Sequence, residues 1–157
     1  MTRTNLILLA TVGSAALLAG AFGFQYLGGL APCHLCLLQR YPHAVAIAAG
    51  LLALLLRSGL AGRVLPWLGA AAALTTSGIG AYHTGVERHW WLGPSTCTSG
   101  SIGSLSPKDL FAQIKAAPVV HCDQVAWEMF GISMASWNML ASLALVVVWV
   151  TAATRRS

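Results

Sequence analysis

The stretch PCHLCLLQR, residues 32–40, lies between two long apolar runs, which indicates that a CxxC pair is held at the edge of a membrane. We expect a helix to begin just after Cys36, with Arg40 four residues beyond that cysteine. A helix N-terminus carries partial positive charge, and such a terminus together with a nearby cation lowers the pKa of a thiol. Because the thiolate is the form that attacks disulfides, we interpret Cys33 and Cys36 as a redox-active dithiol.

The composition is typical of a membrane protein. Of 157 residues, 57% are hydrophobic and only 8% are charged, whereas a soluble domain carries about 25% charged residues. The net charge of +5 does not indicate a nucleic-acid partner, because the basic residues are not clustered and almost all lie beside apolar runs. We therefore expect one compact membrane domain over residues 1–157.

Four apolar segments approach the length of about 20 residues that a membrane-spanning helix needs. The expected spans are 6–27, 37–56, 64–83 and 133–153, and the expected outer loops are 28–36 and 84–132. The predicted fold class is thus an all-α membrane protein with a four-transmembrane-helix bundle. A cleaved signal peptide is the alternative for the first span, since Ala19-Gly20-Ala21 resembles a cleavage site, but its apolar run exceeds a usual core of roughly 7–15 residues.

Two details of the spans bear on helix packing. Pro42 suits the first turn of a helix, but it would kink a helix that had already begun at Cys36. Small residues recur at fourfold spacing in the pairs Ala46/Gly50 and Gly69/Ala73. Such pairs let helices approach closely in lipid, although the abundance of alanine explains them equally well.

The placement of charges predicts the orientation in the membrane. If the spans alternate, one side holds no acidic residue and five arginines, Arg3, Arg57, Arg63, Arg155 and Arg156. The other side holds all four acidic residues. The positive-inside rule places the arginine-rich side, and with it both termini, in the cytoplasm. All four cysteines then lie outside or at the outer membrane face, where disulfides persist.

The second outer loop is expected to contain a short interfacial helix. Ser106-Pro107-Lys108-Asp109 is typical of an N-cap followed by a first helical turn. An apolar stripe follows, made of Leu110, Phe111 and Ile114. This helix would keep the loop low on the membrane while Cys97 and Cys122 remain mobile. An ordinary capped loop helix explains the pattern equally well.

Four cysteines outside the membrane permit three pairings, and the local one joins Cys33 to Cys36 and Cys97 to Cys122. Structural disulfides are the alternative, which is weaker for Cys33–Cys36 because so short a ring constrains little of the unfolded chain. A zinc site usually has two CxxC knuckles and this chain has one. Haem attachment would need CxxCH, but Leu37 follows Cys36. No metal is therefore expected.

A dithiol at the membrane edge needs an electron acceptor, and a lipid-soluble quinone is the natural candidate. Arg40 would hold a thiolate or a reduced quinone oxygen, although snorkelling to headgroups also explains its position. His83 ends the third span and has Glu87 within i,i+4 reach. His83 could donate a hydrogen bond or a proton to a quinone carbonyl, or it could be an interface residue capped by Glu87.

These motifs resemble the DsbB family, the bacterial inner-membrane enzymes that reoxidise the periplasmic disulfide donor DsbA. The matching pieces are Pro32-Cys33-x-x-Cys36-x-x-Gln39-Arg40, Tyr82-His83-x-Gly85-Val86-Glu87, the pair Cys97 and Cys122, and Trp127 with Gly131-Ile132-Ser133-Met134 and Trp137-Asn138. The likeness covers essentially the whole chain, and the order of the motifs between four spans is specific.

The resemblance implies a relay of disulfides. Cys97 would form the mixed disulfide with a DsbA-like, thioredoxin-fold partner, and Cys122 would be its companion in the loop disulfide. Electrons would then pass to Cys33–Cys36 through a transient Cys33–Cys122 bridge and on to ubiquinone or menaquinone.

The quinone end of this relay involves three residues. Cys36 would be the thiolate facing the quinone, with Arg40 and His83 at the quinone. The position of Cys36 also favours it as the thiolate. Cys36 is nearer than Cys33 to the expected helix start and to Arg40, so its thiol should be the more acidic of the two. Asn138 in the last span is expected to make a hydrogen bond between helices, without a catalytic part.

Two other functions fit parts of the pattern. The vitamin K epoxide reductase group also combines a CxxC with loop cysteines in a helical membrane bundle, but its CxxC lies near a late span. A non-catalytic membrane subunit with two structural disulfides is the alternative from another class.

Overall fold

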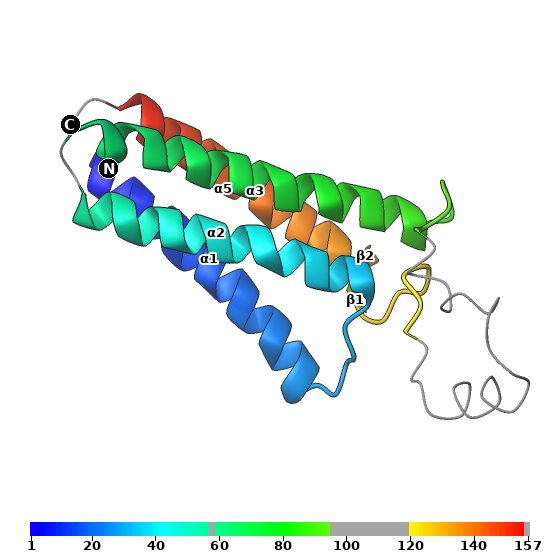
Figure 1. Cartoon of the computed structure of the whole chain (residues 1–157). Coiled ribbons are helices and arrows are strands. Elements are labelled where there is room, and N and C mark those ends of the chain that lie inside the picture. Colours follow the sequence, from blue (N-terminus) through cyan, green and yellow to red (C-terminus); the bar gives the residue numbers. More distant parts are fainter. Residues whose placement is uncertain (57–58, 95–119, 156–157) are drawn as a thin grey trace, which may run out of the picture.

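The computed structural model describes residues 1–56, 59–94 and 120–155, and within them the chain forms four helices and one short hairpin. The helices are α1 (Arg3–Tyr26), α2 (His34–Leu55), α3 (Gly59–Glu87) and α5 (Met134–Thr154). The strands β1 (Glu128–Met129) and β2 (Ile132–Ser133) precede α5. Figure 1 shows an up-and-down bundle with both termini at one end and the hairpin at the other.

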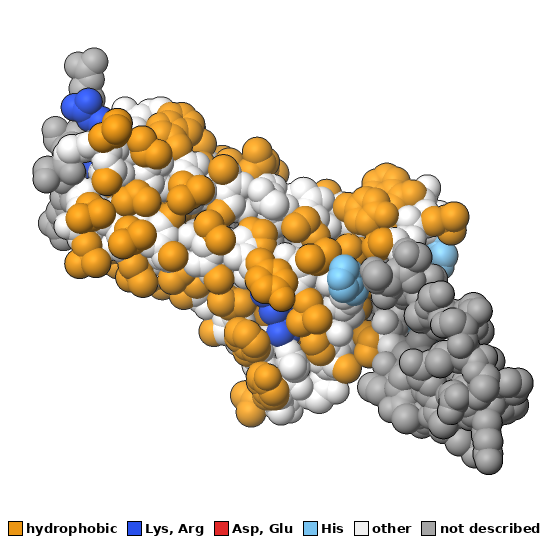
Figure 2. Space-filling model, viewed as in Figure 1, with side chains coloured by type: hydrophobic (Ala, Val, Ile, Leu, Met, Phe, Trp, Pro, Cys, Tyr) orange, Lys and Arg blue, Asp and Glu red, His pale blue; other side chains and the backbone are white. Residues whose placement is uncertain are grey.

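All four described helices are long and apolar enough to cross a membrane. They contain 21 to 29 residues, compared with the minimum of about 20 that the hydrocarbon core requires. Hydrophobic side chains cover the visible sides of the bundle (Figure 2). The prediction of an all-α bundle with four spans is confirmed. The short helix expected after Ser106 lies outside the described residues.

The start of the second helix differs from the prediction. Helix α2 begins at His34, so the expectation that it starts after Cys36 is wrong. Cys33 is the N-cap, and its sulfur accepts a hydrogen bond from the backbone N–H of Cys36 at 3.2 Å. A sulfur here takes the place of the oxygen that usually satisfies a free N–H of the first turn. Pro42 consequently lies inside the helix.

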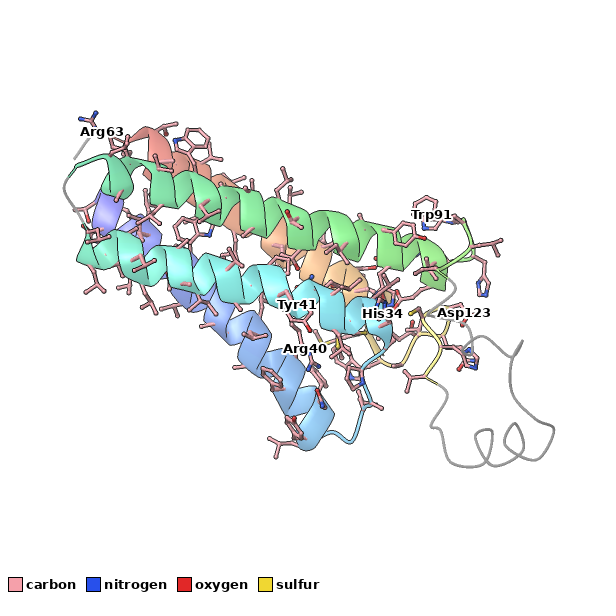
Figure 3. The ribbon with its side chains drawn as sticks, in the orientation of Figure 1. His34, Arg40, Tyr41, Arg63, Trp91 and Asp123 are labelled. Carbon is pink, nitrogen blue, oxygen red and sulfur yellow. The ribbon has the colours of Figure 1, made fainter. Side chains whose placement is uncertain are left out.

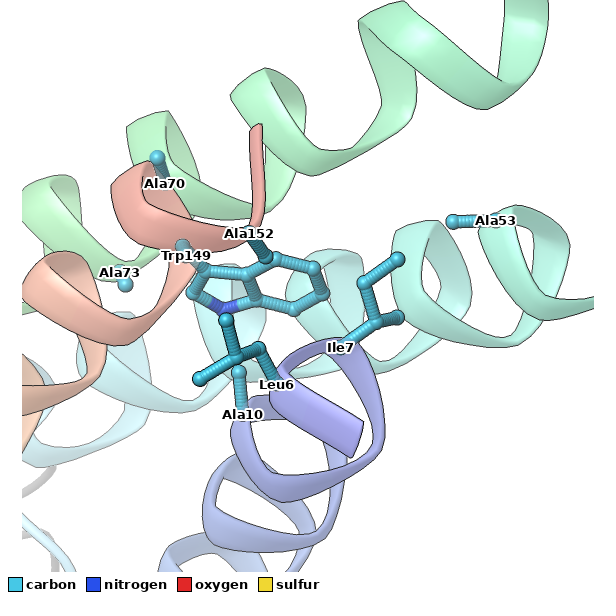
Figure 4. Close-up of a cluster of buried hydrophobic side chains, with 8 residues drawn as sticks. All are labelled: Leu6, Ile7, Ala10, Ala53, Ala70, Ala73, Trp149 and Ala152. Atoms are coloured by element: carbon cyan, nitrogen blue, oxygen red, sulfur yellow. The ribbon is translucent and has the colours of Figure 1, made fainter. Parts of the chain in front are cut away.

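The core at the end with the termini is built around one large ring. Trp149 is fully buried and packs among seven smaller side chains, Leu6, Ile7, Ala10, Ala53, Ala70, Ala73 and Ala152 (Figure 4). Gly69 also faces this ring, because a Cβ at that position would lie 2.7 Å from it. Close packing therefore accounts for the pair Gly69/Ala73, and Gly50 faces Thr11 of α1 in the same way.

Described charged residues divide between the two ends of the bundle as expected. The Arg3 guanidinium donates to the carbonyls of Ala152, at 3.2 Å, and Gly62, so it joins α1 to α5 and α3. Arg63 lies at this end, whereas His34 and Asp123 lie at the other (Figure 3). The cysteine pair and the termini are thus at opposite ends of the bundle.

The hairpin positions the start of α5. Its two-residue turn, Phe130 and Gly131, has positive φ at both positions, 56° and 72°, as the favoured hairpin turns require. The pairing of Glu128 with Ser133 then brings the chain back to the helix start. Ser133 is the N-cap of α5 and accepts a hydrogen bond from the backbone N–H of Ser136.

Replacement of Gly69 by Ala should destabilise the bundle by about 1–3 kcal/mol, because the new methyl group overpacks the buried ring of Trp149. Thermal unfolding in detergent micelles measures this effect. Gly78→Ala is the matched control on the same helix, since a Cβ there meets nothing within 4 Å. Equal stability of the two variants would contradict close packing of Gly69 against the Trp149 ring.

Candidate functional site

Cys33 and Cys36 are free thiols at the start of α2, with their sulfur atoms 2.7 Å apart. Cys33 is buried and Cys36 is partly exposed. The ring of His83 from α3 approaches the pair, with Nε2 3.6 Å from the Cys33 sulfur. The backbone of Cys122 is also hydrogen-bonded to this ring. His83 therefore stands between the first cysteine pair and the segment that carries Cys122.

The side chain of Gln39 determines which nitrogen of His83 carries the proton. Gln39 Nε2 lies 3.3 Å from the carbonyl oxygen of Leu35, which only accepts hydrogen bonds, so this atom is the amide NH₂. The same NH₂ lies 3.0 Å from His83 Nδ1, which must then be the acceptor. In the neutral ring the proton is on Nε2. The single N–H of His83 accordingly faces both the Cys33 sulfur and the backbone of Cys122.

Asn138 of α5 is hydrogen-bonded to the oxygen of the Gln39 side-chain amide. Its Nδ2 donates to Gln39 Oε1 at 2.7 Å and to Thr76 Oγ1 of α3 at 3.1 Å. Its Oδ1 accepts from His43 Nε2 of α2 at 2.9 Å. Asn138 therefore links three helices, and the prediction of an interhelical hydrogen bond at this residue is confirmed.

Glu87 lies one helical turn after His83 on α3 and approaches the same ring nitrogen as the Cys33 sulfur. Its carboxylate Oε1 is 3.8 Å from His83 Nε2, and its Oε2 accepts a hydrogen bond from the hydroxyl of Ser133. Ser136 continues the chain of contacts to Thr84, with the two hydroxyl oxygens 2.9 Å apart. The end of α3 is thus attached to the start of α5, and His83 and Glu87 are held one helical turn apart.

Arg40 extends from α2 toward α1 (Figure 3). Its guanidinium donates to Gln25 Oε1 at 2.6 Å and to the carbonyl of Ala21 at 3.2 Å, and it lies 4.8 Å above the ring of Phe22. These contacts hold the cation against α1 rather than at a distance from the protein among headgroups. Its Nε is buried and has no hydrogen-bond partner among the described residues.

A cleft of about 530 Å³ opens beside these groups. Its walls come from α1, α2, α3, α5 and the segment 120–129, and most of its lining is apolar. The lining contains four of the sequence-predicted site residues, Cys33, Cys36, Arg40 and His83. Helix α1 diverges from α2 toward this end of the bundle (Figure 1), which leaves room for the cleft.

The remaining two predicted cysteines are placed differently. Cys122 is fully buried and disulfide-bonded. It packs in one cluster with Cys33, Leu35 and Val86. Cys97 and the predicted Cys97–Cys122 bridge lie outside the described residues.

The two thiols at the start of α2 are not equivalent. The pKa of the Cys33 thiol is raised above its ordinary value, because its hydrogen bond with Cys36 and its burial favour the neutral form. The backbone N–H of Cys36 acts in the opposite sense but does not prevail. The proton of Cys33 is therefore held more firmly than that of an ordinary thiol.

Cys33, Cys36 and His83 are also the one described group with the geometry for a metal ion, with ligand atoms within 4.8 Å of one another. Two thiolates and an imidazole would suit zinc. A ligating imidazole must present a lone pair to the metal, however, and here Nδ1 faces Gln39 while Nε2 presents a proton to the sulfur. The hydrogen bonds thus favour thiol chemistry.

The family model described as disulfide bond formation protein DsbB matches residues 3–152 of the chain. The chain belongs to the DsbB family. Proteins named Disulfide bond formation protein B are similar to it over nearly their whole length. The one from Polaromonas sp. (strain JS666) is 26% identical over 96% of this chain and 90% of its own. The one from Albidiferax ferrireducens is 30% identical, with 90% and 86% covered, and the one from Stutzerimonas stutzeri is 29% identical, with 92% of each covered.

Membership of the DsbB family makes the chain a membrane thiol oxidoreductase that delivers electrons to a quinone. The four apolar helices agree with a multi-pass protein of the bacterial inner membrane. The family match also favours this reading over the vitamin K epoxide reductase group.

Sequence patterns assign no role in the site to Gln39 or His43, and to Asn138 only a hydrogen bond between helices. Gln39 and Asn138 belong to the motifs of the DsbB resemblance, and His43 follows Arg40 without an assigned role. Spacing is the signal that could have found the two on α2. Positions 36, 39, 40 and 43 follow the i, i+3, i+4, i+7 pattern of one helix face, and all four line the cleft.

The raised pKa of Cys33 predicts how the reduced pair titrates. In a variant with Cys97 and Cys122 replaced by alanine, at most one thiolate per chain should form up to pH 9.0, the ordinary value for the Cys33 thiol. The ultraviolet absorbance of the thiolate follows this titration. Cys33→Ser should remove the step above that pH, and two thiolates below it would contradict the assignment of the proton to Cys33.

Proposed function

We propose that the chain oxidises a periplasmic, DsbA-like thioredoxin-fold partner through Cys97 and Cys122. The electrons then pass through Cys33–Cys36 to ubiquinone or menaquinone in the cleft. One observation carries this proposal: the free thiols Cys33 and Cys36 line an apolar cleft between membrane-spanning helices. Members of the family whose names describe disulfide bond formation support the same direction of electron flow.

The residues of the cleft fit a quinone. A quinone ring is apolar on its faces and carries two carbonyl oxygens, which need N–H donors in a site without bulk water. The buried Arg40 Nε supplies such a donor, because no described group accepts its hydrogen. A quinone bound here supplies the two-electron acceptor, and Arg40 would hold one of its oxygens.

The cysteine pair provides the electrons. In the reduced pair Cys36 carries the negative charge and Cys33 the proton. Formation of the Cys33–Cys36 disulfide breaks the S–H bond of Cys33, makes one S–S bond, and releases two electrons and one proton. The N–H of His83 is placed to stabilise negative charge on the Cys33 sulfur when that cysteine is the attacking thiolate.

The position of Cys122 beside the first cysteine pair supports the relay. Cys122 belongs to the same buried cluster as Cys33, which favours Cys33 as the cysteine that forms the transient bridge with Cys122. Cys97 would then be the residue that forms the mixed disulfide with the partner, since attack of the partner thiolate on Cys97 breaks the Cys97–Cys122 bond and frees the Cys122 sulfur to attack Cys33.

The proposed orientation places both termini in the cytoplasm and the cysteines in the periplasm. Arg3 begins α1 and Arg155 caps the end of α5, so both lie at the end with the termini. Arg63 lies at the same end (Figure 3), and these arginines support the orientation through the positive-inside rule. A single membrane domain over residues 1–157 and an interfacial helix over residues 106–117 complete the proposal, and that helix would keep the partner-facing loop near the membrane.

Cys36→Ser should abolish quinone reduction while leaving Cys97 able to form a mixed disulfide with the reduced partner, because the variant lacks only the last sulfur of the relay. Stopped-flow quinone absorbance measures the first property and thiol trapping on non-reducing gels measures the second. Undiminished turnover would refute the role of Cys36. A non-catalytic subunit with structural disulfides would show neither turnover nor a mixed disulfide in the wild-type protein.

Arg40→Ala should raise the quinone concentration needed for half-maximal rate by roughly 10-fold, the effect of losing one hydrogen bond from a charged donor. Steady-state quinone reduction with saturating reduced partner measures it. Arg63→Ala is the control, because Arg63 is exposed at the opposite end of the bundle. An unchanged quinone requirement in Arg40→Ala would remove Arg40 from the site.

A further inference from the structure

His43 is a second imidazole in the cleft that the relay does not use. It lies on α2, seven residues after Cys36, and its exposed fraction is 3%. The residue lines the same cleft as Cys36 and Arg40. Its Nδ1 is buried and makes no hydrogen bond within the described part of the chain. A buried polar atom without a partner is costly, which indicates that a ligand group completes it.

The hydrogen bonds around His43 determine which of its ring nitrogens carries the proton, starting from a backbone carbonyl that can only accept. The hydroxyl of Thr76 donates to the carbonyl oxygen of Gln39 at 3.0 Å, which leaves the oxygen of Thr76 as an acceptor. The Asn138 atom 3.1 Å from that oxygen must therefore be its NH₂. The other side-chain atom of Asn138 is then its carbonyl oxygen, and it faces His43 Nε2 at 2.9 Å.

This chain of contacts leaves one arrangement for the neutral ring. His43 Nε2 must carry the proton, because it faces an acceptor, and Nδ1 must be a lone pair. Two residues that line the cleft thus each have a nitrogen without a partner in the described part of the chain, an acceptor on His43 and a donor on Arg40. A donor suits a quinone carbonyl, whereas an acceptor suits only a group that carries a hydrogen.

We infer that His43 Nδ1 accepts a hydrogen bond from a hydroxyl of the reduced, hydroquinone form of the ligand. His43 is thus a binding residue that favours hydroquinone over quinone. The inference rests on the proposed quinone function and goes beyond it, because it assigns the two redox forms to different residues. Arg40 binds an oxygen in either form, and His43 distinguishes the forms by the presence of the hydroxyl hydrogen.

Equilibrium binding to the full-length protein in detergent micelles tests this inference. All proteins carry Cys36→Ser, so that the ligands are not converted during the measurement. The probes are a decyl-substituted benzoquinone, its hydroquinone, and the dimethyl ether of that hydroquinone, which keeps the ring and lacks both hydroxyl hydrogens. His43→Leu should weaken hydroquinone binding by roughly 3- to 10-fold, the effect of one hydrogen bond, and leave the other two probes unchanged.

Two further variants make the result specific. His43→Gln should retain hydroquinone binding, because a glutamine can donate its NH₂ to Asn138 and present its oxygen to the cleft. His34→Leu is the control, since His34 is exposed on the same helix and does not line the cleft; it should change none of the three affinities.

Three outcomes would overturn the inference. Equal loss of all three probes in His43→Leu would show a packing role, and no loss would show that a water molecule, not the ligand, satisfies Nδ1. Failure of all three probes to bind when His43 is present would instead reject the proposed quinone function itself, and this inference with it.

Discussion

The amide of Asn138 is the interaction on which the geometry of the site depends. A polar side chain between membrane-spanning helices has no water to bond to, so it must find partners on neighbouring helices. Asn138 donates to Gln39 and Thr76 and accepts from His43, which joins α5 to both α2 and α3. Each of these contacts has only one possible direction, because two backbone carbonyls accept at the ends of the network.

The directions of these hydrogen bonds determine which nitrogen of His83 bears a proton beside the sulfur atoms. Gln39 can donate to His83 only because its oxygen is occupied by Asn138. His83 in turn presents its N–H to the Cys33 sulfur because its other nitrogen accepts from Gln39. An imidazole that points a proton at a cysteine stabilises a thiolate or a forming disulfide, whereas the opposite tautomer would suit a metal. The network thus selects between two chemistries available to the same three residues.

Hydropathy and charge alone predict much of the fold and little of the site's detail. The four spans, the end of the bundle on which Cys33 and Cys36 lie, and the proximity of Cys36 and Arg40 to one cleft follow from apolar run length and helical spacing. The helix start at His34 was missed because Cys33 caps it through sulfur, whereas the usual signal is an oxygen-bearing residue. Gln39 and His43 were missed for another reason, since their roles depend on partners from α3 and α5 that lie 37 to 99 residues away in sequence.

Helix α1 makes different contacts at the two ends of the bundle. Near its start α1 packs closely on Trp149 through Leu6 and Ala10. Near its end it is held by Arg40 and by Phe24, whose ring lies 5.0 Å from that of Trp127. Trp127 follows Cys122 by five residues and lines the cleft. The segment that brings Cys122 to Cys33 therefore also forms a wall of the cleft, so the two stages of the proposed relay would share a structural element. A movement of this segment that exposed Cys122 would alter the cleft at the same time.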